Sequence, residues 1–310
     1  MIIGTRGSKL ALAQATIVQE RLEAEGIETR IKIIKTSGDR IIDRPLHTIS
    51  GFGAFVREID SAMLAGEIDI AVHSMKDMPT ERPEGLVTAA VLKRDSPFDA
   101  LITRDGAGID ELPLGAVIGT TSLRRRAQIL SYRSDLVVRD LRGNIDTRLR
   151  KLRSGEYDGI MLAEAGLERM NWTAGYQRLG LEDFPPSANQ GTIAVVTRRD
   201  TRAEAAVKIL DHAPTRLECD AERIIISVLG GGCSAPVAAY AELEGERLHV
   251  TAEVLSIDAT RRVRVREEIP VADYALHSMR LGEELKRGGG GELVDEAIQY
   301  FQERGGRGDG

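Results

Sequence analysis

Short apolar runs alternate with stretches of helical periodicity along the first part of the chain. The opening MIIGTRG is typical of a short strand, and the apolar positions after it fall on one face of a helix expected over residues 9–25, between the cap Ser8 and the stop Gly26. TRIKIIKT predicts the next strand, residues 55–64 a second helix, and the nearly continuous apolar run IDIAVHS a buried parallel strand. This order predicts βαβ units.

A second group of the same kind follows between two linkers, LKRDSPFDA and FPPSANQG, in which proline stands beside polar or small residues. The expected elements are a strand AVIGT, a helix that starts at Ser122, a strand LVVRDL, a helix over residues 144–154 and a strand GIMLAEAG. TIAVVTRR, after the second linker, is strand-like again, and we expect it to return to the first sheet.

The pattern changes after a helical stretch over residues 201–228. AAYAELEG, RLHVTAEVLS and RRVRVREEI alternate as antiparallel strands with one face in water do. Two helices, over residues 271–286 and 292–303, are expected next, with a flexible RGGGGE loop between them and a disordered tail.

These elements predict an α/β fold with two doubly wound lobes resembling type II periplasmic binding proteins, followed by a C-terminal α+β domain with a small antiparallel sheet. We expect the first domain to comprise residues 1–93 and 191–211, the second 97–187 and the third 214–310. Such lobes bind ligands between them, outside the carboxyl ends of parallel strands.

Composition and charge narrow the function. The chain is 42% hydrophobic and 29% charged, has no apolar run of about 18 residues, and begins without the features of a signal peptide, so we expect a cytoplasmic protein without a membrane partner. The net charge of −6 disfavours a general nucleic-acid binder. Residues 124–153, however, hold nine arginines and one lysine against three aspartates, a local charge of +7 that indicates an anionic partner.

Arginines and hydroxyl side chains follow three of the predicted strands, where helix N-termini and planar guanidinium groups suit carboxylates or phosphates. They are Arg6 and Ser8 in GTRGS, Thr120, Thr121, Ser122, Arg124 and Arg125 in GTTSLRRR, and Arg142 and Arg148 in LRGNIDTRLRK. A capped helix with a solvated arginine is the alternative at any one of them. Repetition at three strand ends favours an anion site.

AVHSMKDMP ends another strand and places Ser74, Lys76 and Asp77 together. A carboxylate near a lysine stays ionised at neutral pH and could stabilise a cationic intermediate or move a proton. A surface turn with a local ion pair is the alternative. His73, inside the strand, is expected to be a core histidine with its polar atoms satisfied.

VLGGGCSAPV places Cys233 behind three glycines, which could hold a thiol out on a loop near arginines. An incidental loop cysteine is the alternative, and Cys219, in a helical run, is expected to pack in the core. The two cysteines lack the spacing and partners of a zinc site, so no metal is expected. The sequence contains neither a phosphate loop nor a GxGxxG turn, so it does not indicate a nucleotide cofactor.

The chain resembles the porphobilinogen deaminase, or hydroxymethylbilane synthase, family over nearly its whole length. The matching segments, in order, are GTRGSKLALAQ, DIAVHSMKDMP, IGTTSLRRRAQ, LRGNIDTRL, NQGTIAV and GGGCSAPVAAYAE. The resemblance implies a transferase of porphyrin biosynthesis that couples four porphobilinogen molecules head to tail, with loss of ammonia, into the linear tetrapyrrole hydroxymethylbilane. It also implies one dipyrromethane cofactor per chain, bound through a thioether.

The same resemblance assigns roles to residues. Cys233, by its place in GGGCSAPV, would carry the cofactor, and Asp77, in HSMKD, would be the catalytic aspartate. The residues implied to hold cofactor and substrate are Arg6, Ser8, Ser74, Lys76, Asp77, Thr120, Ser122, Arg124, Arg125, Arg142, Gly143, Arg148, Arg169 and Gln190. Every porphobilinogen carries an acetate and a propionate, so binding of these carboxylates would account for the positive charge of residues 124–153. The resemblance also implies that Cys233 anchors the primer and is not the nucleophile in each turnover.

Two other functions are weighed against this one. A non-catalytic two-lobed binding protein for an anionic metabolite would share the fold but carry no adduct on Cys233, and nucleic-acid binding is opposed by the net charge and by the lack of interleaved aromatics. The family further implies a monomer. The chain departs from many bacterial relatives at Thr48 and Phe52, where lysines are common, and in NQG, which replaces GQG.

Overall fold

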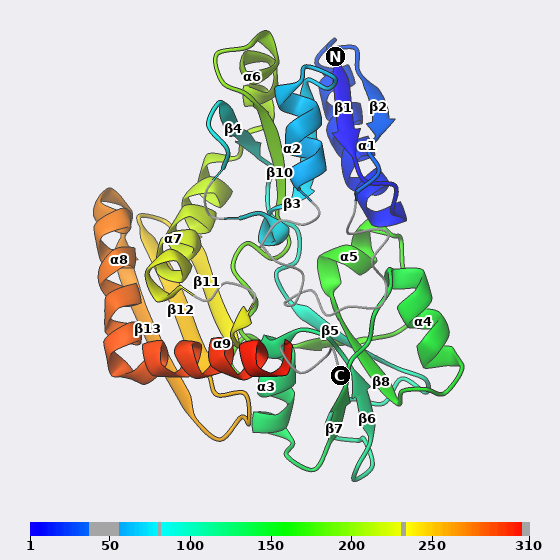
Figure 1. Ribbon diagram of the computed structural model, residues 1–310, viewed down its shortest axis with the longest axis vertical. Helices are drawn as coiled ribbons and strands as arrows, with labels where there is room; N and C mark the ends of the chain where they lie inside the picture. The colour runs from blue at the N-terminus through cyan, green and yellow to red at the C-terminus, as the bar shows by residue number, and fades with distance from the viewer. Residues whose placement is uncertain (37–55, 80–81, 231–233, 306–310) are drawn as a thin grey trace.

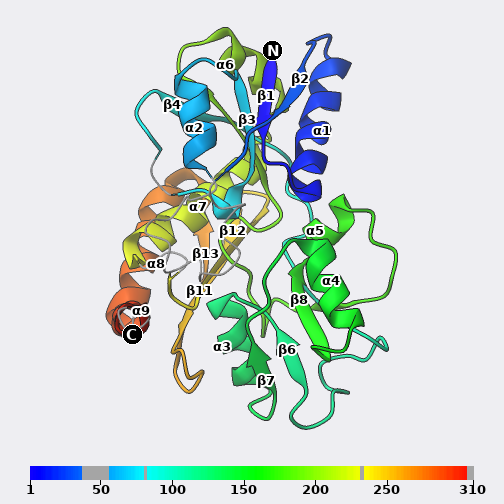
Figure 2. The same ribbon diagram turned by 45° about the vertical axis from the view of Figure 1, so that its right-hand side comes forward.

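The computed structural model describes residues 1–36, 56–79, 82–230 and 234–305, and its strands form three sheets (Figure 1). Two sheets have five strands each and the third has three. The first two lie toward opposite ends of the molecule, and the third lies to one side of them (Figures 1 and 2). Within the described ranges, no helix is both apolar and long enough to cross a membrane.

The first sheet has the strand order β2-β1-β3-β10-β4. Its elements are β1 (Ile2–Thr5), α1 (Lys9–Ala24), β2 (Arg30–Ile33), α2 (Arg57–Leu64), β3 (Ile70–Ser74), β4 (Leu86–Val91), β10 (Ile193–Arg198), α6 (Arg202–Val207) and the 3₁₀ turn η3 (Lys208–Leu210). Apolar side chains of α1 and α6 pack on one face and those of α2 on the other. Strands β1, β2 and β3 are parallel, as the sequence predicts. The return of TIAVVTRR as β10 is confirmed, and β10 runs antiparallel to both of its neighbours.

The second sheet has the order β7-β6-β8-β5-β9, with β6 parallel to β7 and β8 and with β5 antiparallel to β8 and β9. Its elements are β5 (Asp99–Thr103), β6 (Val117–Gly119), α3 (Leu123–Tyr132), β7 (Val137–Arg139), α4 (Ile145–Arg153), β8 (Gly159–Ala163), α5 (Glu164–Arg169) and β9 (Gln177–Leu179). Helix α3 packs on one face, and α4 and α5 on the other. The predicted strand GIMLAEAG is too long, because β8 ends at Ala163 and α5 begins at Glu164.

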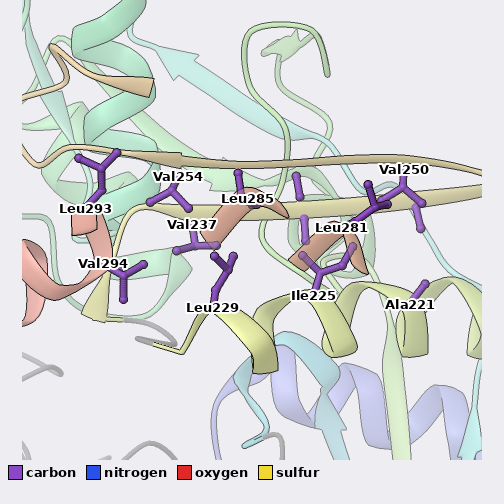
Figure 3. Packing of buried hydrophobic residues seen from close by; sticks show 14 of the residues in the cluster. Ala221, Ile225, Leu229, Val237, Val250, Val254, Leu281, Leu285, Leu293 and Val294 are labelled. Carbon is purple, nitrogen blue, oxygen red and sulfur yellow. The ribbon is translucent and has the colours of Figure 1, made fainter. Parts of the chain in front are cut away.

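The third sheet is antiparallel, in the order β11-β12-β13, as predicted. Its elements are α7 (Ala213–Leu229), β11 (Val237–Glu244), β12 (Arg247–Leu255), β13 (Arg262–Pro270), the 3₁₀ turn η5 (Val271–Asp273), α8 (Tyr274–Leu285), η6 (Lys286–Gly290) and α9 (Gly291–Gly305). Figure 3 shows Ile225 and Leu229 of α7 and Leu281 and Leu285 of α8 facing the apolar side of this sheet, where all four are buried. The α/β fold with a C-terminal α+β domain is therefore confirmed.

The prediction of a flexible RGGGGE loop is wrong. Residues 286–290 join α8 to α9 through a kink at Gly289. Gly289 has a φ of 107°, which favours glycine, and a Cβ on buried Gly290 would lie 2.6 Å from the Leu285 carbonyl oxygen. The glycines therefore permit a tight corner between two packed helices.

Glu222 of α7 joins the two segments that cross between the first and second sheets, residues 92–98 and 180–192, which we call the first and second crossings. Its fully buried carboxylate accepts hydrogen bonds from Arg94 Nη1 at 2.8 Å in one crossing and from the Asn189 backbone N–H at 2.6 Å in the other. The Ala241 N–H of β11 donates to it at 2.9 Å. One carboxylate thus ties both crossings to the third sheet.

Candidate functional site

Lys76 and Asp77 lie just beyond the carboxyl end of β3, in the 3₁₀ turn η2 (Met75–Asp77). Met75 is buried and anchors the turn, whereas Asp77 is exposed. Lys76 Nζ donates to Gln190 Oε1 at 3.2 Å, which joins the end of β3 to the second crossing. The turn therefore presents the Asp77 carboxylate to solvent next to the Lys76 ammonium group, which Gln190 holds in place.

Asp99, at the start of β5, is the centre of a buried cluster of cations. Its side chain is fully buried, and Oδ2 accepts from Arg124 Nη1 at 2.7 Å. Oδ1 accepts from Arg125 Nη2 at 2.8 Å and from Gln190 Nε2 at 2.8 Å. These two guanidinium groups hold the pKa of Asp99 well below its usual range despite its burial. Gln190 therefore bridges this cluster to Lys76.

Cations exceed carboxylates in this region. Burial and the repulsion of Arg125 lower the pKa of Lys76 to about 8, although Asp77 and Asp99 act in the opposite direction. Burial and the same arginine lower the pKa of Arg148 to about 10, again opposed by Asp77. We refer to Lys76, Arg124, Arg125 and Arg148 together with Asp77 and Asp99 as the cation cluster. It holds four basic groups against two carboxylates, so it has charge to spare for an anionic ligand.

The lowered pKa of Lys76 has a consequence for stability. The unfolded chain keeps this proton up to the ordinary pKa of 10.5, whereas the folded chain loses it near 8, so the free energy of unfolding rises with pH between these values. Compared with Lys76→Met, the wild type is expected to gain on the order of 2 kcal/mol between about pH 7 and about pH 10, after allowance for partial exposure of the side chain. Urea unfolding of both proteins at the two pH values measures the difference; a constant difference would contradict the assignment.

Three predicted hydroxyl groups act inside their own turns. Ser8 Oγ accepts from the Ala11 N–H at 3.3 Å and caps α1, and Ser122 Oγ accepts from the Arg125 N–H at 3.4 Å and caps α3. Thr120 Oγ1 accepts from the Ser122 N–H at 3.1 Å. These oxygens thereby fix the helix N-termini that follow β1 and β6.

Gly143 lies in the loop between β7 and α4 with a φ of 107°, and a Cβ there would lie 2.6 Å from Thr147 Cγ2. Its carbonyl oxygen accepts from Arg148 Nε at 2.8 Å, so the glycine turn directs the Arg148 side chain. Arg142, immediately before it, is half-buried. Helix α4 also approaches α1 from the second sheet (Figure 2), through an ion pair of 2.9 Å between Asp146 and Lys9.

Two further residues lie at the ends of β1 and β3. Ser74 Oγ accepts from the buried Gln14 Nε2 at 2.7 Å, which holds the end of β3 against α1. Arg6 lies close enough to His73 to help depress the pKa of this histidine to about 3, after the larger effects of burial and of Arg82. His73 is buried as predicted. Its Nε2, however, has no hydrogen-bond partner within the described ranges, so the prediction that its polar atoms are satisfied is wrong.

Arg169 is placed differently from the other predicted arginines. Its Nε donates to Asp95 Oδ2 at 2.8 Å and its Nη2 donates to the Gly191 carbonyl oxygen at 2.5 Å. Asp95 and Gly191 belong to the two crossings, so Arg169 fastens both crossings to the end of α5. The side chain is 6% exposed.

Some of the site was not predicted, and some of the prediction lies outside the described residues. Asp99 and Gln14 are missing from the sequence prediction, because an aspartate before an apolar strand and a glutamine on a helix face carry no local signal. Cys233, Thr48 and Phe52 fall outside the described ranges. Cys219 is fully buried in α7, as predicted. Burial raises the pKa of its thiol to about 11.

Two family models match the chain. The model described as "Porphobilinogen deaminase, dipyromethane cofactor binding domain" matches residues 1–206, and "Porphobilinogen deaminase, C-terminal domain" matches residues 216–287. The chain belongs to the porphobilinogen deaminase family. The segments that carry the resemblance in the sequence therefore lie in a chain whose family is established over most of its length.

Curated relatives agree with this family. The chain is 61% identical over 304 residues to "Probable porphobilinogen deaminase" of Methanosarcina barkeri, with 97% of this chain and 96% of the relative covered. It is 56% identical over 300 residues to the protein of the same name from Methanococcoides burtonii, with 96% and 97% covered. Among solved structures, a periplasmic substrate-binding protein of an ABC transporter from Coxiella burnetii matches with 15% identity and a TM-score of 0.43, covering 70% of this chain and 94% of that one.

The family's cofactor is a dipyrromethane, and the cation cluster fits such a group. Burial, together with the repulsion of Arg125, lowers the pKa values of Lys76 and Arg148, and the cluster holds four basic groups against two carboxylates, so it has room for added negative charge. A group bearing several carboxylates would supply it. Guanidinium groups bind carboxylates through paired, directional hydrogen bonds.

Proposed function

We propose that this chain is a hydroxymethylbilane synthase: it couples four porphobilinogen molecules head to tail, with release of ammonia, into the linear tetrapyrrole of porphyrin biosynthesis. The observation that carries the proposal is the exposed Asp77 carboxylate beside Lys76 and Arg148, in a cluster that holds four basic groups against two carboxylates. The family of the chain supports the same reaction.

The proposed roles follow from the positions of the residues. The cation cluster and the arginines beside it hold the acetates and propionates, whose number grows by two with each added ring, and Cys233 anchors the dipyrromethane. The proposed ligand-binding set is Arg6, Ser8, Ser74, Lys76, Thr120, Ser122, Arg124, Arg125, Arg142, Gly143, Arg148, Arg169 and Gln190. When bound, the dipyrromethane supplies a free pyrrole α-carbon as the primer for chain growth.

Asp77 acts on the substrate. Loss of ammonia from the aminomethyl group of porphobilinogen leaves an electron-poor azafulvene cation, and a carboxylate near its pyrrole N–H stabilises the developing positive charge. Asp77 can serve the same purpose after the carbon–carbon bond forms, when the ring again carries positive charge.

Arg124 and Arg125 are buried, so their part in the proposal is to keep positive charge at a fixed place. Their shared bond to Asp99 prevents the two guanidinium groups from moving apart. Fixed charge stabilises a ligand without the cost of reorganising flexible side chains. Lys76 and Arg148, which are less enclosed, are then the cations that meet incoming carboxylates.

The proposal includes the three-domain division at residues 1–93 with 191–211, 97–187 and 214–310. The gap between the two family matches, from residue 206 to residue 216, supports a boundary near the start of α7. A cytoplasmic location, a monomeric state and the absence of nucleic-acid binding stay predictions that rest on composition and on the family.

Intact-mass spectrometry tests the proposed reaction, because each coupling adds one porphobilinogen less one ammonia to a protein-bound chain. Mixing the purified protein with a few equivalents of porphobilinogen is expected to produce a ladder of heavier species separated by that increment. A mass that does not change, with porphobilinogen left unconsumed, would support a binding protein instead.

A further inference from the structure

Glu253 is a fully buried carboxylate on β12, in the third sheet, and it faces the second sheet's helix α3. Its Oε2 accepts from Arg264 Nη2 at 2.6 Å, and its Oε1 accepts from Gln128 Nε2 at 2.8 Å. Buried carboxylates are costly unless they are fully paired. The reaction described above gives this carboxylate no role.

Gln128 connects Glu253 to the cation cluster. The glutamine is fully buried, and its Oε1 accepts from Arg124 Nη1 at 2.8 Å while its Nε2 donates to Glu253 and to the Pro185 carbonyl oxygen at 2.8 Å. Arg124 Nη1 in turn donates to Asp99. A continuous series of hydrogen bonds thus runs from the third sheet to Asp99, which also holds Arg125 and Gln190.

The orientation of the Gln128 amide determines whether Arg124 has an acceptor at this position. The three hydrogen bonds that fix the guanidinium all leave from Nη1, toward Asp99, Gln128 and the Pro185 carbonyl, and within the described ranges its buried Nε has no partner. A glutamine amide can present either oxygen or NH₂ to a neighbour. The negative charge of Glu253 selects NH₂ on its own side and therefore oxygen on the side of Arg124.

We propose that Gln128 and Glu253 are positioning residues for the cation cluster: they fix Arg124, and through Asp99 also Arg125, from the third sheet. The inference rests on the proposed function, since it assigns these residues to the binding of porphobilinogen carboxylates. Because the third domain also carries Cys233, the same contacts set the cluster relative to the domain that anchors the primer.

Gln128→Leu tests this, with Glu182→Ala as the matched control. Glu182 belongs to the same contact between the sheets, through ion pairs with Arg264 and Arg266, but its side chain is 71% exposed and does not touch Gln128 or Arg124. We expect Gln128→Leu to raise KM for porphobilinogen at least about tenfold and to change kcat less than about threefold, because guanidinium–carboxylate contacts are made in the ground state as well as in the transition state. Glu182→Ala is expected to match the wild type.

Cofactor loading gives a readout separate from turnover. Incubation of unloaded protein with porphobilinogen, followed over time by intact mass, is expected to show at least about tenfold slower loading of Gln128→Leu than of Glu182→Ala. Glu253→Gln, which keeps the shape of the side chain but removes its charge, is expected to show the same two defects to a smaller extent. This milder variant serves if Gln128→Leu does not fold.

The double variant Gln128→Leu with Glu253→Leu separates positioning from simple packing. Gln128→Leu leaves Glu253 Oε1 without its donor, and Glu253→Leu takes Arg264 Nε and Nη2 from their partner, so the double variant should lose less thermal stability than the sum of the two single losses, whereas KM and loading should stay defective because Arg124 still lacks its Oε1 partner. Recovery of KM and loading together with stability would overturn the proposal, as would normal values in both single variants. If the wild type and Glu182→Ala both fail to consume porphobilinogen, the proposed function itself fails, and this inference with it.

Discussion

Asp77→Ala is expected to lower the turnover number for porphobilinogen at least about 100-fold while leaving the fold and the covalent group in place. The side chain is exposed, and within the described ranges it makes no hydrogen bond, so its removal takes away no buried contact. What it does remove is the only carboxylate of the cation cluster that is open to solvent. The positive charge that develops on the substrate would then face Lys76 and Arg148 without a counter-ion.

Single-turnover kinetics with porphobilinogen, together with the intact mass of each protein, measures this effect. Asp146→Ala is the matched control, because it removes another exposed carboxylate, at the start of the helix that carries Arg148, whose ion pair in the described residues is with Lys9 at 2.9 Å. Asp146→Ala is expected to behave as the wild type, and Asp77→Ala is expected to carry the dipyrromethane but barely extend it. Near-normal turnover by a loaded Asp77→Ala protein would refute the role given to this residue.

Asp99→Leu is expected to destabilise the folded chain by about 3–5 kcal/mol, because it leaves two buried guanidinium groups without a counter-charge. Arg124 and Arg125 have side chains that are 4% and 7% exposed, and Asp99 is fully buried. The lowered pKa of Asp99 means that its contribution is complete above the unfolded pKa, near 4, and is lost only as the pH falls below that value. The effect of the substitution should therefore be full at neutral pH.

Asp135→Leu provides the comparison for this prediction. Asp135 also forms a two-bonded pair with an arginine, Arg133, at 2.7 Å, but at the surface, where such pairs contribute about 0–1 kcal/mol. Urea unfolding at neutral pH should place the two variants several kcal/mol apart. Equal losses in stability would show that Asp99 does not hold the arginines, and the cation cluster would then need another explanation.

Local sequence signals predicted much of this structure. Ser8, Ser122 and Asn144 each cap the helix that the sequence placed after them, because capping depends only on the next three residues. The buried Cys219 followed from its helical surroundings in the same way. The strand ends that carry Arg6, Thr120 and Arg142 followed from the alternation of strands and helices.

Contacts between distant segments could not be predicted in this way. Asp99 meets Arg124, Arg125 and Gln190 across 25, 26 and 91 residues of chain, and no local pattern marks these partners. Glu253 meets Gln128 across 125 residues. The direction of β10 was missed for a related reason, since an apolar run does not record which way its neighbours run.

The position of Arg169 shows a further limit of motif reasoning. Its place in AGLERM assigned it to the ligands through the family, whereas its hydrogen bonds in the structure go to Asp95 and Gly191 in the two crossings. Arg169 can both bind a ligand and hold Asp95 and Gly191 only if ligand binding changes its contacts with the two crossings. A sequence motif identifies which side chain is present at a position, but its binding partners depend on the tertiary structure.

The central claim, a pyrrole-coupling enzyme primed on Cys233, is tested most directly by the intact mass of the chain purified from cells that make porphobilinogen. The wild type is expected to exceed the mass of its sequence by one dipyrromethane, and Cys233→Ser to match its own sequence, with Cys219→Ser as the cysteine control that keeps the adduct. A wild type that carries no added mass, and gains none when porphobilinogen is supplied, would contradict the account.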